Sequence, residues 1–487
     1  MAAEPGEPEE RGAVEPFETR EAGEPGERGK PGTVASMDML TTLPAGVRRA
    51  RRAREGVVAL AATGILALAA CTDGVPTGAG VGGPSTAPAS TSGRPSLDAS
   101  TSTTVAPSTT TTAPDTATAP DTATPSDTTT STTSTPSTSC TGRLVDRLTL
   151  EQRVRQLLMV GIQPAQAPDG LDATIRSQHI GGVIYLGGWQ GSGGVSATST
   201  HVQEQATGPA TGGLGMFVAA DQEGGQVQQL KGSGFTAMPS ALAQGQSAES
   251  AIRRNGTTVG TELKRAGVNV NLAPVADTVP ADVGRANAPI GRYSRGFGND
   301  PATVSVGVAA TIQGLAAAGV ASTVKHFPGL GRVSGNTDTT SQGITDDTTS
   351  PTDPYLQPFT AGIRAGASFV MVSSARYPKI DPDNQAVFSP AVISELLRST
   401  LGYHGVVITD DVGVAKAVDA VAPGARAVRF IAAGGDIVLT ATASTVPAMT
   451  AALRERAGGD PAFAQKLDAS VRRVISLKQQ MGLATCT

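Results

Sequence analysis

The sequence predicts an α/β protein whose folded part is a single (β/α)8 barrel of the TIM type, a closed ring of parallel strands surrounded by helices. Eight short apolar segments recur between residues 141 and 487, and each is followed by a turn and a longer alanine-rich stretch compatible with a helix. Strands that alternate with helices form right-handed βαβ units, and eight such units in about 300 residues fit a closed barrel. A doubly wound open sheet is the alternative that this pattern leaves open.

A helix that leads into the first strand is expected to start after Thr149. Thr149 stands in the N-cap position, where its hydroxyl can accept a backbone hydrogen bond, and the first strand follows this helix directly. The eight apolar segments that we expect to form the barrel strands are Leu157–Ile162, Val183–Leu186, Met216–Ala220, Val268–Pro274, Ala321–Phe327, Phe369–Ser374, Val406–Asp410 and Asp436–Thr440.

Residues 72–140 are expected to form an extended, solvated linker. Ser and Thr occupy 25 of the 40 positions from 101 to 140, interleaved with Pro and three Asp and without one Lys or Arg. A segment so poor in large apolar groups cannot offset the entropy lost on ordering. The linker accounts for part of the low aromatic content of the chain, which is 3%.

The segment before the linker has the order of an export signal. Five Arg residues between positions 48 and 54 precede an apolar run, Val57–Ala70, which is too short to span a bilayer and ends at Cys71. Leu68-Ala69-Ala70-Cys71 resembles the lipobox of bacterial lipoproteins, in which the cysteine is acylated. We therefore interpret residues 47–71 as a lipoprotein signal peptide, and expect the protein at the extracytoplasmic face of the cell membrane, held by a lipid anchor only. Residues 1–46 are interpreted as a disordered leader, or as upstream sequence from a wrongly chosen start codon.

The remaining cysteines and the overall charge exclude several classes of protein. Three cysteines in 487 residues exclude a disulfide scaffold, but export to an oxidising compartment permits a Cys140–Cys486 bridge that joins the two ends of one domain. The formal net charge of −4 excludes a general polyanion binder, so nucleic acid is not an expected partner. The His and Cys residues show no spacing typical of metal ligands, and we expect no metal site and no cofactor.

Polar residues follow the predicted strands at the end of a barrel where catalytic groups are found. Asp221 follows the third strand, the Lys325-His326 pair ends the fifth, and Asp410 follows the seventh. Arg295 lies in a glycine-rich loop after the fourth strand. A buried Lys-His pair needs anionic or polar partners, which a hydroxyl-rich substrate would supply. Asp410 is the best catalytic candidate, because only one residue of the Asp410-Asp411 pair is needed to cap the following helix.

These residues resemble those of a known family. Asp-Gln-Glu-Gly-Gly at 221–225, Lys-His-Phe-Pro-Gly at 325–329 and Thr-Asp-Asp at 409–411 look like the motifs of glycoside hydrolase family 3, in its single-domain β-N-acetylglucosaminidase branch, over about residues 144–482. The resemblance implies that Asp410 is the nucleophile of a retaining hydrolysis that proceeds through a covalent glycosyl-enzyme. It also implies that a second set of residues holds the sugar in the −1 site: Asp221, Arg295, Lys325 and His326.

The general acid is the point at which the chain departs from the family pattern. The family branch has a histidine at the position of Leu330 and a second, catalytic histidine at the position of Thr340, in a loop that ends in Asp-Ser-His. Asp338 is the candidate acid that remains in this loop. The alternatives are that Asp346 or Asp347 moves in to act as the acid, or that the acid step is weak. Gln226 and Gln229 likewise replace two arginines of the family.

The sequence therefore predicts a monomeric exo-β-N-acetylhexosaminidase that removes terminal β-linked N-acetylglucosamine from peptidoglycan-derived fragments. The 47 residues that follow Thr440 leave room for closing helices only, which disfavours the two-domain β-glucosidase branch. Two alternatives stay open. One is a phosphorylase or another β-glycosidase of the same family, and the other is a catalytically degenerate surface lipoprotein that only binds glycan.

Overall fold

The computed structural model describes residues 139–164, 172, 175 and 178–486. The predicted leader, the predicted signal peptide with Cys71, and the predicted linker up to residue 138 lie outside the described residues. Among the described residues, no helix combines the length and the apolar character needed to cross a bilayer.

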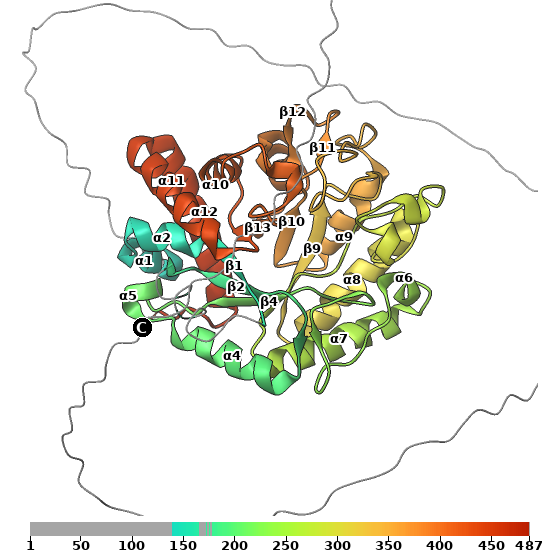
Figure 1. Cartoon of the computed structure of the whole chain (residues 1–487), viewed down its shortest axis with the longest axis horizontal. Coiled ribbons are helices and arrows are strands. Elements are labelled where there is room, and N and C mark those ends of the chain that lie inside the picture. Colours follow the sequence, from blue (N-terminus) through green and yellow to red (C-terminus); the bar gives the residue numbers. More distant parts are fainter. Residues whose placement is uncertain (1–138, 165–171, 173–174, 176–177, 487) are drawn as a thin grey trace, which may run out of the picture. The chain divides into compact units, whose positions relative to one another are not determined.

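Eight parallel strands form the centre of the fold, one from each segment predicted by the sequence. Each strand pairs with the next one along the chain, and the helices surround them (Figure 1). A parallel bridge between Ile408 and Ile437 joins the seventh strand to the start of the eighth and completes the ring, which confirms the barrel over the open sheet. The strands are β1 (Leu158–Ile162), β2 (Gly182–Tyr185), β4 (Phe217–Ala220), β8 (Val270–Asn271), β9 (Ala321–Phe327), β10 (Phe369–Val372), β13 (Val406–Thr409) and β14 (Val438–Thr440).

The helix start predicted at Thr149 is confirmed, and a further helix, α1 (Cys140–Arg147), precedes it. Thr149 caps α2 (Leu150–Gln156) in a capping box, in which the Thr149 side chain accepts from the Gln152 N–H and the Gln152 side chain accepts from the Thr149 N–H. The other helices of the outer layer are α1 (Cys140–Arg147), α4 (Ser192–Glu204), α5 (Gly208–Thr211), α6 (Ala241–Gln244), α7 (Glu249–Arg265), α8 (Pro301–Ala317), α9 (Gln357–Arg364), the π-helical η5 (Ala391–Thr400), α10 (Pro423–Ala432), α11 (Val446–Gly459) and α12 (Pro461–Gln480).

The loops that connect strands to helices contain short strands and 3-10 helices. The two-stranded pairs are β3 (Trp189–Gln190) with β7 (Leu230–Lys231), β5 (Gln222–Gly224) with β6 (Val227–Gln228), and β11 (Arg376–Tyr377) with β12 (Asp381–Gln385). The short 3-10 helices are η1 (Gly284–Ala286), η2 (Gly291–Tyr293), η3 (Pro354–Leu356), η4 (Ala386–Phe388), η6 (Lys416–Val418) and η7 (Ala443–Thr445).

Apolar side chains fill the barrel and glycines allow the outer helices to approach closely. Phe217 of β4 and Phe369 of β10 come from non-adjacent strands, and their rings meet edge to face at 5.4 Å inside the barrel. On the outside, a Cβ added at Gly314 of α8 would lie 2.3 Å from the Arg253 carbonyl oxygen of α7. The α7–α8 contact therefore requires glycine at this position.

A lysine lies buried near the amino-terminal end of the barrel. Lys478 of α12 donates to Gln156 Oε1 at 2.6 Å and to the Gly181 carbonyl oxygen at 2.9 Å, with its Nζ 4.9 Å from the Phe217 ring centre. Burial lowers the pKa of this amine to about 7.

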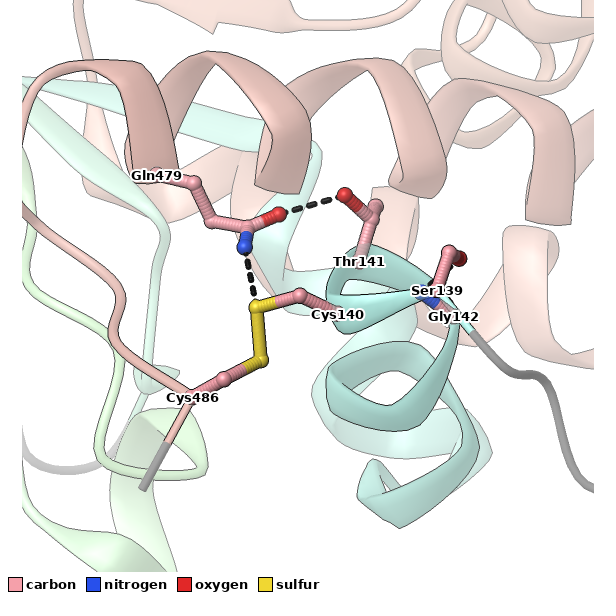
Figure 2. Close-up of a disulfide and its surroundings, with 6 residues drawn as sticks. All are labelled: Ser139, Cys140, Thr141, Gly142, Gln479 and Cys486. Atoms are coloured by element: carbon pink, nitrogen blue, oxygen red, sulfur yellow. Dashed lines mark hydrogen bonds between the residues drawn. A yellow bond between two sulfur atoms is a disulfide. The ribbon is translucent and has the colours of Figure 1, made fainter.

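A disulfide joins the two ends of the described domain. Cys140, at the start of α1, is bonded to Cys486, and their Cα atoms lie 5.9 Å apart although 346 residues separate them in the chain (Figure 2). The Gln479 side-chain amide of α12 donates to Cys140 Sγ at 2.5 Å, and its carbonyl oxygen accepts from Thr141. This pairing is the one expected from the sequence, and it attaches α1 to the last helix of the barrel.

Candidate active site

A cavity of about 540 Å³ opens where the parallel strands end. Its walls include all six residues that the sequence predicted for the site: Asp221, Arg295, Lys325, His326, Asp338 and Asp410. Parallel barrel strands all end on one face, so residues far apart in the sequence meet there.

Two cations of this cavity, the buried Lys325 and the half-buried Arg295, share one carboxylate, Glu223. Lys325 Nζ lies 2.5 Å from Asp221 Oδ1 and 2.6 Å from Glu223 Oε1. Arg295 contacts Glu223 through two parallel bonds, from Nε to Oε2 at 2.8 Å and from Nη2 to Oε1 at 2.7 Å. Burial opposes ionisation of Glu223, but the charges of Arg295 and Lys325 outweigh burial and lower its pKa to about 2.

Glu223 is a site residue that sequence reasoning missed, although the Asp-Gln-Glu-Gly-Gly motif contains it. A hydroxyl-rich substrate was expected to satisfy Lys325, but its partners are carboxylates of the protein. Desolvating Lys325 and Arg295 requires compensating negative charge. Glu223 supplies it from β5, which directly follows β4 and forms a hairpin with β6. The charges of Asp221, Glu223, Arg295 and Lys325 are thus paired with one another. Within this cluster the Asp221 side chain is about one fifth exposed, so it can contact a substrate in the cavity.

A second missed carboxylate, Asp277, orients His326. Asp277 Oδ2 lies 2.7 Å from His326 Nδ1, and Oδ1 accepts the Leu330 N–H at 2.7 Å. Asp277 is fully buried and His326 nearly so. Because the carboxylate accepts a hydrogen bond from Nδ1–H, the other ring nitrogen, Nε2, is the one left near the Arg295 Nη2, at 3.5 Å. His326 thus has a fixed ring orientation on the wall of the cavity, and its anionic partner is in the protein.

The two neighbouring aspartates after β13 have different partners. Asp411 Oδ1 accepts the N–H groups of Gly413 at 2.8 Å and Ala441 at 2.9 Å, and Oδ2 accepts the Val414 N–H at 3.3 Å. Among the hydrogen bonds of the described residues, the Asp410 carboxylate accepts one, from the Asp411 N–H at 2.9 Å. Asp411 therefore stabilises the turn, whereas most of the Asp410 carboxylate is left for chemistry in the cavity.

Asp338 lines the same cavity, with a carboxyl group that holds its proton at higher pH than usual. Asp338 is exposed as a residue, but desolvation of its carboxyl group in the cavity and, second, the negative charge of Asp410 together raise its pKa to about 6, against the lowering effect of His326 and Arg295. A carboxyl group that is protonated near neutral pH can donate a proton to a leaving group.

The loop that carries Asp338 is attached to the segment that follows Asp410. The Asp338 carbonyl oxygen accepts the Lys416 N–H at 3.1 Å, and the Thr337 carbonyl oxygen accepts the Ala417 N–H at 3.0 Å. Asn336 Oδ1 accepts the Asp338 N–H at 3.0 Å. The backbone beside the candidate acid is therefore held by the same loop that begins at the candidate nucleophile.

The two alternative acids lie elsewhere. Asp346 is buried, and its carboxylate accepts hydrogen bonds from the backbone and hydroxyl groups of Thr348 and Thr349 at 2.6–3.0 Å. These bonds outweigh the effect of burial and lower its pKa, so it is built to stay ionised. Asp347 is exposed, and neither residue lines the cavity. Of the three candidates, the geometry favours Asp338.

A parallel barrel that ends in a cavity with an ionised carboxylate, a protonatable carboxyl group and a set of donors for hydroxyl groups has the architecture of a glycoside hydrolase. Comparison with known proteins agrees. The chain belongs to glycosyl hydrolase family 3, because the model of the family's N-terminal domain matches residues 149–477.

Relatives in this family carry consistent names. A beta-hexosaminidase of Stenotrophomonas maltophilia (strain K279a) is 37% identical over 232 residues, which are 46% of this chain and 66% of the relative. The crystal structure of a beta-N-acetylhexosaminidase from Beutenbergia cavernae DSM 12333 is 46% identical, with a TM-score of 0.66, over 68% of this chain and 99% of that chain. A family 3 beta-N-acetylglucosaminidase from Paenibacillus sp. str. FPU-7 is 30% identical, with a TM-score of 0.63, over 70% of this chain and 64% of that one.

Proposed function

We propose that this chain is a retaining exo-β-N-acetylhexosaminidase that removes terminal β-linked N-acetylglucosamine from peptidoglycan-derived fragments. Asp410 attacks the anomeric carbon while Asp338 gives its proton to the departing oxygen, which leaves a covalent glycosyl-Asp410 ester. Asp338, now a carboxylate, then takes a proton from water, and the resulting hydroxide displaces Asp410 from the sugar with overall retention. The observation that carries this proposal is that Asp338 and Asp410 line the same cavity, where the charge of Asp410 contributes to a pKa of about 6 for Asp338.

The remaining cavity residues suit the binding of a sugar. Asp221 can accept hydrogen bonds from hydroxyl groups, and Lys325, Arg295 and His326 supply donors or a ring nitrogen from fixed positions. The relatives named beta-hexosaminidase and beta-N-acetylhexosaminidase support an amino sugar as the substrate. A protein that merely bound glycan would not need one carboxylic acid tuned to protonate near neutral pH beside a second carboxylate.

The location of the protein is part of the proposal. Acylation of Cys71 would attach a monomer to the extracytoplasmic face of the cell membrane, and the Ser/Thr/Pro-rich linker would let the barrel reach wall fragments. Replacing Cys71 by Ala in the full chain should move the protein from the membrane fraction to the soluble fraction, and unchanged membrane retention would refute the anchor.

The catalytic proposal is tested by trapping. A fluorinated N-acetylglucosaminyl donor should add one sugar mass to the full chain, and peptide mapping should place that mass on Asp410. Asp410→Ala should abolish both the adduct and the hydrolysis of an aryl β-N-acetylglucosaminide, whereas Asp347→Asn, an exposed acid outside the cavity, should alter neither. Equal turnover by the wild type and Asp410→Ala would refute the nucleophile. Release of sugar phosphate in phosphate buffer would instead identify a phosphorylase.

A further inference from the structure

Tyr293 and Val414 are exposed hydrophobic side chains at the same cavity. Only five large hydrophobic residues of the described part of the chain are exposed, and these two, 36% and 54% exposed, line the cavity that holds the catalytic carboxylates. Isolated exposed apolar residues are ordinary, but two that line the same cavity give it apolar surface that a ligand can cover.

The depth of the cavity separates this surface from the sugar-binding cluster. The side chains of Lys325 and His326 are 2% and 5% exposed, which places them at the bottom of the cavity. Tyr293 and Val414 are the most solvent-exposed parts of its apolar lining, which places them toward the mouth. An exo-acting enzyme holds the terminal sugar at the closed end, so the group that departs must occupy the mouth.

Tyr293 is held in place by the backbone on both sides. The Tyr293 N–H donates to the Ile290 carbonyl oxygen at 3.2 Å, and the fully buried Asn287 accepts the N–H groups of Ile290 and Gly291. Ser294, the next residue, has a φ of 56°, in the left-handed region that residues with a Cβ seldom adopt. This conformation caps the end of η2, where the Ser294 N–H donates to the Gly291 carbonyl oxygen, so the backbone on both sides of Tyr293 is fixed.

The loop with Tyr293 is also joined to the loop with the candidate acid. The Asn287 side-chain amide donates to the carbonyl oxygens of Leu330 at 2.7 Å and Val333 at 2.8 Å, in the segment that leads to Asp338. On the other wall, Asp411 accepts the Val414 N–H, directly beside Asp410. Tyr293 thus lies in a loop that is hydrogen-bonded to the segment before Asp338, and Val414 is hydrogen-bonded to the residue after Asp410.

We propose that Tyr293 and Val414 form the subsite for the leaving group, and that its occupant is a second pyranose ring whose C–H face packs on the Tyr293 ring. This inference rests on the proposed function. A pyranose has one face rich in C–H groups and hydroxyl groups at its edge, which matches an aromatic ring with polar surroundings. Tyr293 therefore acts as a determinant of leaving-group specificity, in contact with the part of the substrate that departs.

The test compares two substrates that need the same acid catalysis. The full chain is assayed with the β-1,4-linked disaccharide of N-acetylglucosamine and with methyl β-N-acetylglucosaminide, whose alkoxide leaving group carries no ring. Tyr293→Ala should lower kcat/KM for the disaccharide by about tenfold more than for the methyl glycoside, and Tyr293→Phe should retain the wild-type ratio. Val306→Ala, which removes an exposed apolar side chain from α8 outside this cavity, should leave both values unchanged.

Each outcome separates this inference from the proposed function. Equal effects of Tyr293→Ala on the two substrates, or no effect on either, would refute the subsite while hydrolysis itself remains. A selective loss seen only when the leaving sugar carries a peptide would show that the rim binds peptide, which also contradicts the proposal. Absence of hydrolysis of both substrates by the wild type would instead refute the proposed function.

Discussion

Replacing the candidate acid, Asp338→Asn, should lower kcat/KM most for substrates whose leaving group must be protonated as it departs. Asparagine keeps the shape of the side chain and removes the proton that the carboxyl group donates. General acid assistance is worth about 100- to 10,000-fold, so kcat/KM for the N-acetylglucosamine disaccharide should fall by that amount. A nitrophenyl glycoside, which has a good leaving group, should keep most of its kcat/KM.

The structure also gives the pH dependence of this effect. The acid must be protonated in the free enzyme, and its pKa is raised to about 6 by burial and by the charge of Asp410. At pH 7 Asp338 is therefore protonated in only about one tenth of the enzyme molecules. Above this pH, kcat/KM for the disaccharide should fall about tenfold for each further pH unit. In Asp338→Asn this alkaline limb should be absent.

A chemical rescue completes the test. The second step needs Asp338 as a base to activate water, whereas azide is an anionic nucleophile that needs none. Azide should therefore raise kcat of Asp338→Asn on the nitrophenyl glycoside and give the β-configured glycosyl azide. Asp347→Asn serves as the control for loss of an acid from the same loop. Equal losses on both substrates, or an alkaline limb near pH 6 that persists in the variant, would refute our assignment.

Two further predictions concern stability, and the single tryptophan, Trp189, provides a fluorescence signal for both. The pKa of Lys478 is about 7 in the folded protein, against an ordinary value of 10.5. Between these two values the unfolded chain therefore binds more protons than the folded one. The free energy of unfolding should rise with pH in this range, by up to about 1.4 kcal/mol per pH unit. Urea titrations at pH 7 and 9 should show that Lys478→Met loses this rise while Lys466→Met, an exposed site on the same helix, retains it; a rise that survives in Lys478→Met contradicts the explanation. Replacing Cys140 and Cys486 together by Ser should lower the free energy of unfolding by about 2–5 kcal/mol, as should reduction of the wild type, and equal urea midpoints with and without reductant would show that the bridge does not stabilise the domain.

The order of the barrel strands could be predicted because it depends on local composition. Each strand is a short apolar run bounded by turn residues, and the structure has a strand within each of the eight segments. The ends were less predictable. The fourth segment, Val268–Pro274, contains a strand of only two residues, Val270–Asn271, because a strand ends where its pairing with a neighbour ends.

The site was predictable where a residue follows a strand and unpredictable where its role comes from a partner. Asp221, Lys325, His326 and Asp410 stand at strand ends, and all of them line the cavity. Glu223 was not assigned a role, because its function is to neutralise cations that reach it from other strands. The preference for Asp338 over Asp346 likewise depends on tertiary contacts. Asp346 accepts hydrogen bonds within its own turn, whereas the surroundings of Asp338 raise its pKa.

The sequence by itself determined the alternating strands and helices, the cysteines at the ends of the domain and the residue types that follow the strands. Those features follow from composition and from spacing along the chain, which act locally. Only the tertiary structure decided that Ile437 meets Ile408 to close the ring, that Asp277 and Glu223 satisfy the buried cationic and imidazole groups, and that Tyr293 stands at the rim of the cavity. These decisions belong to the fold because the charge, burial and pKa of a side chain depend on neighbours that are distant in sequence.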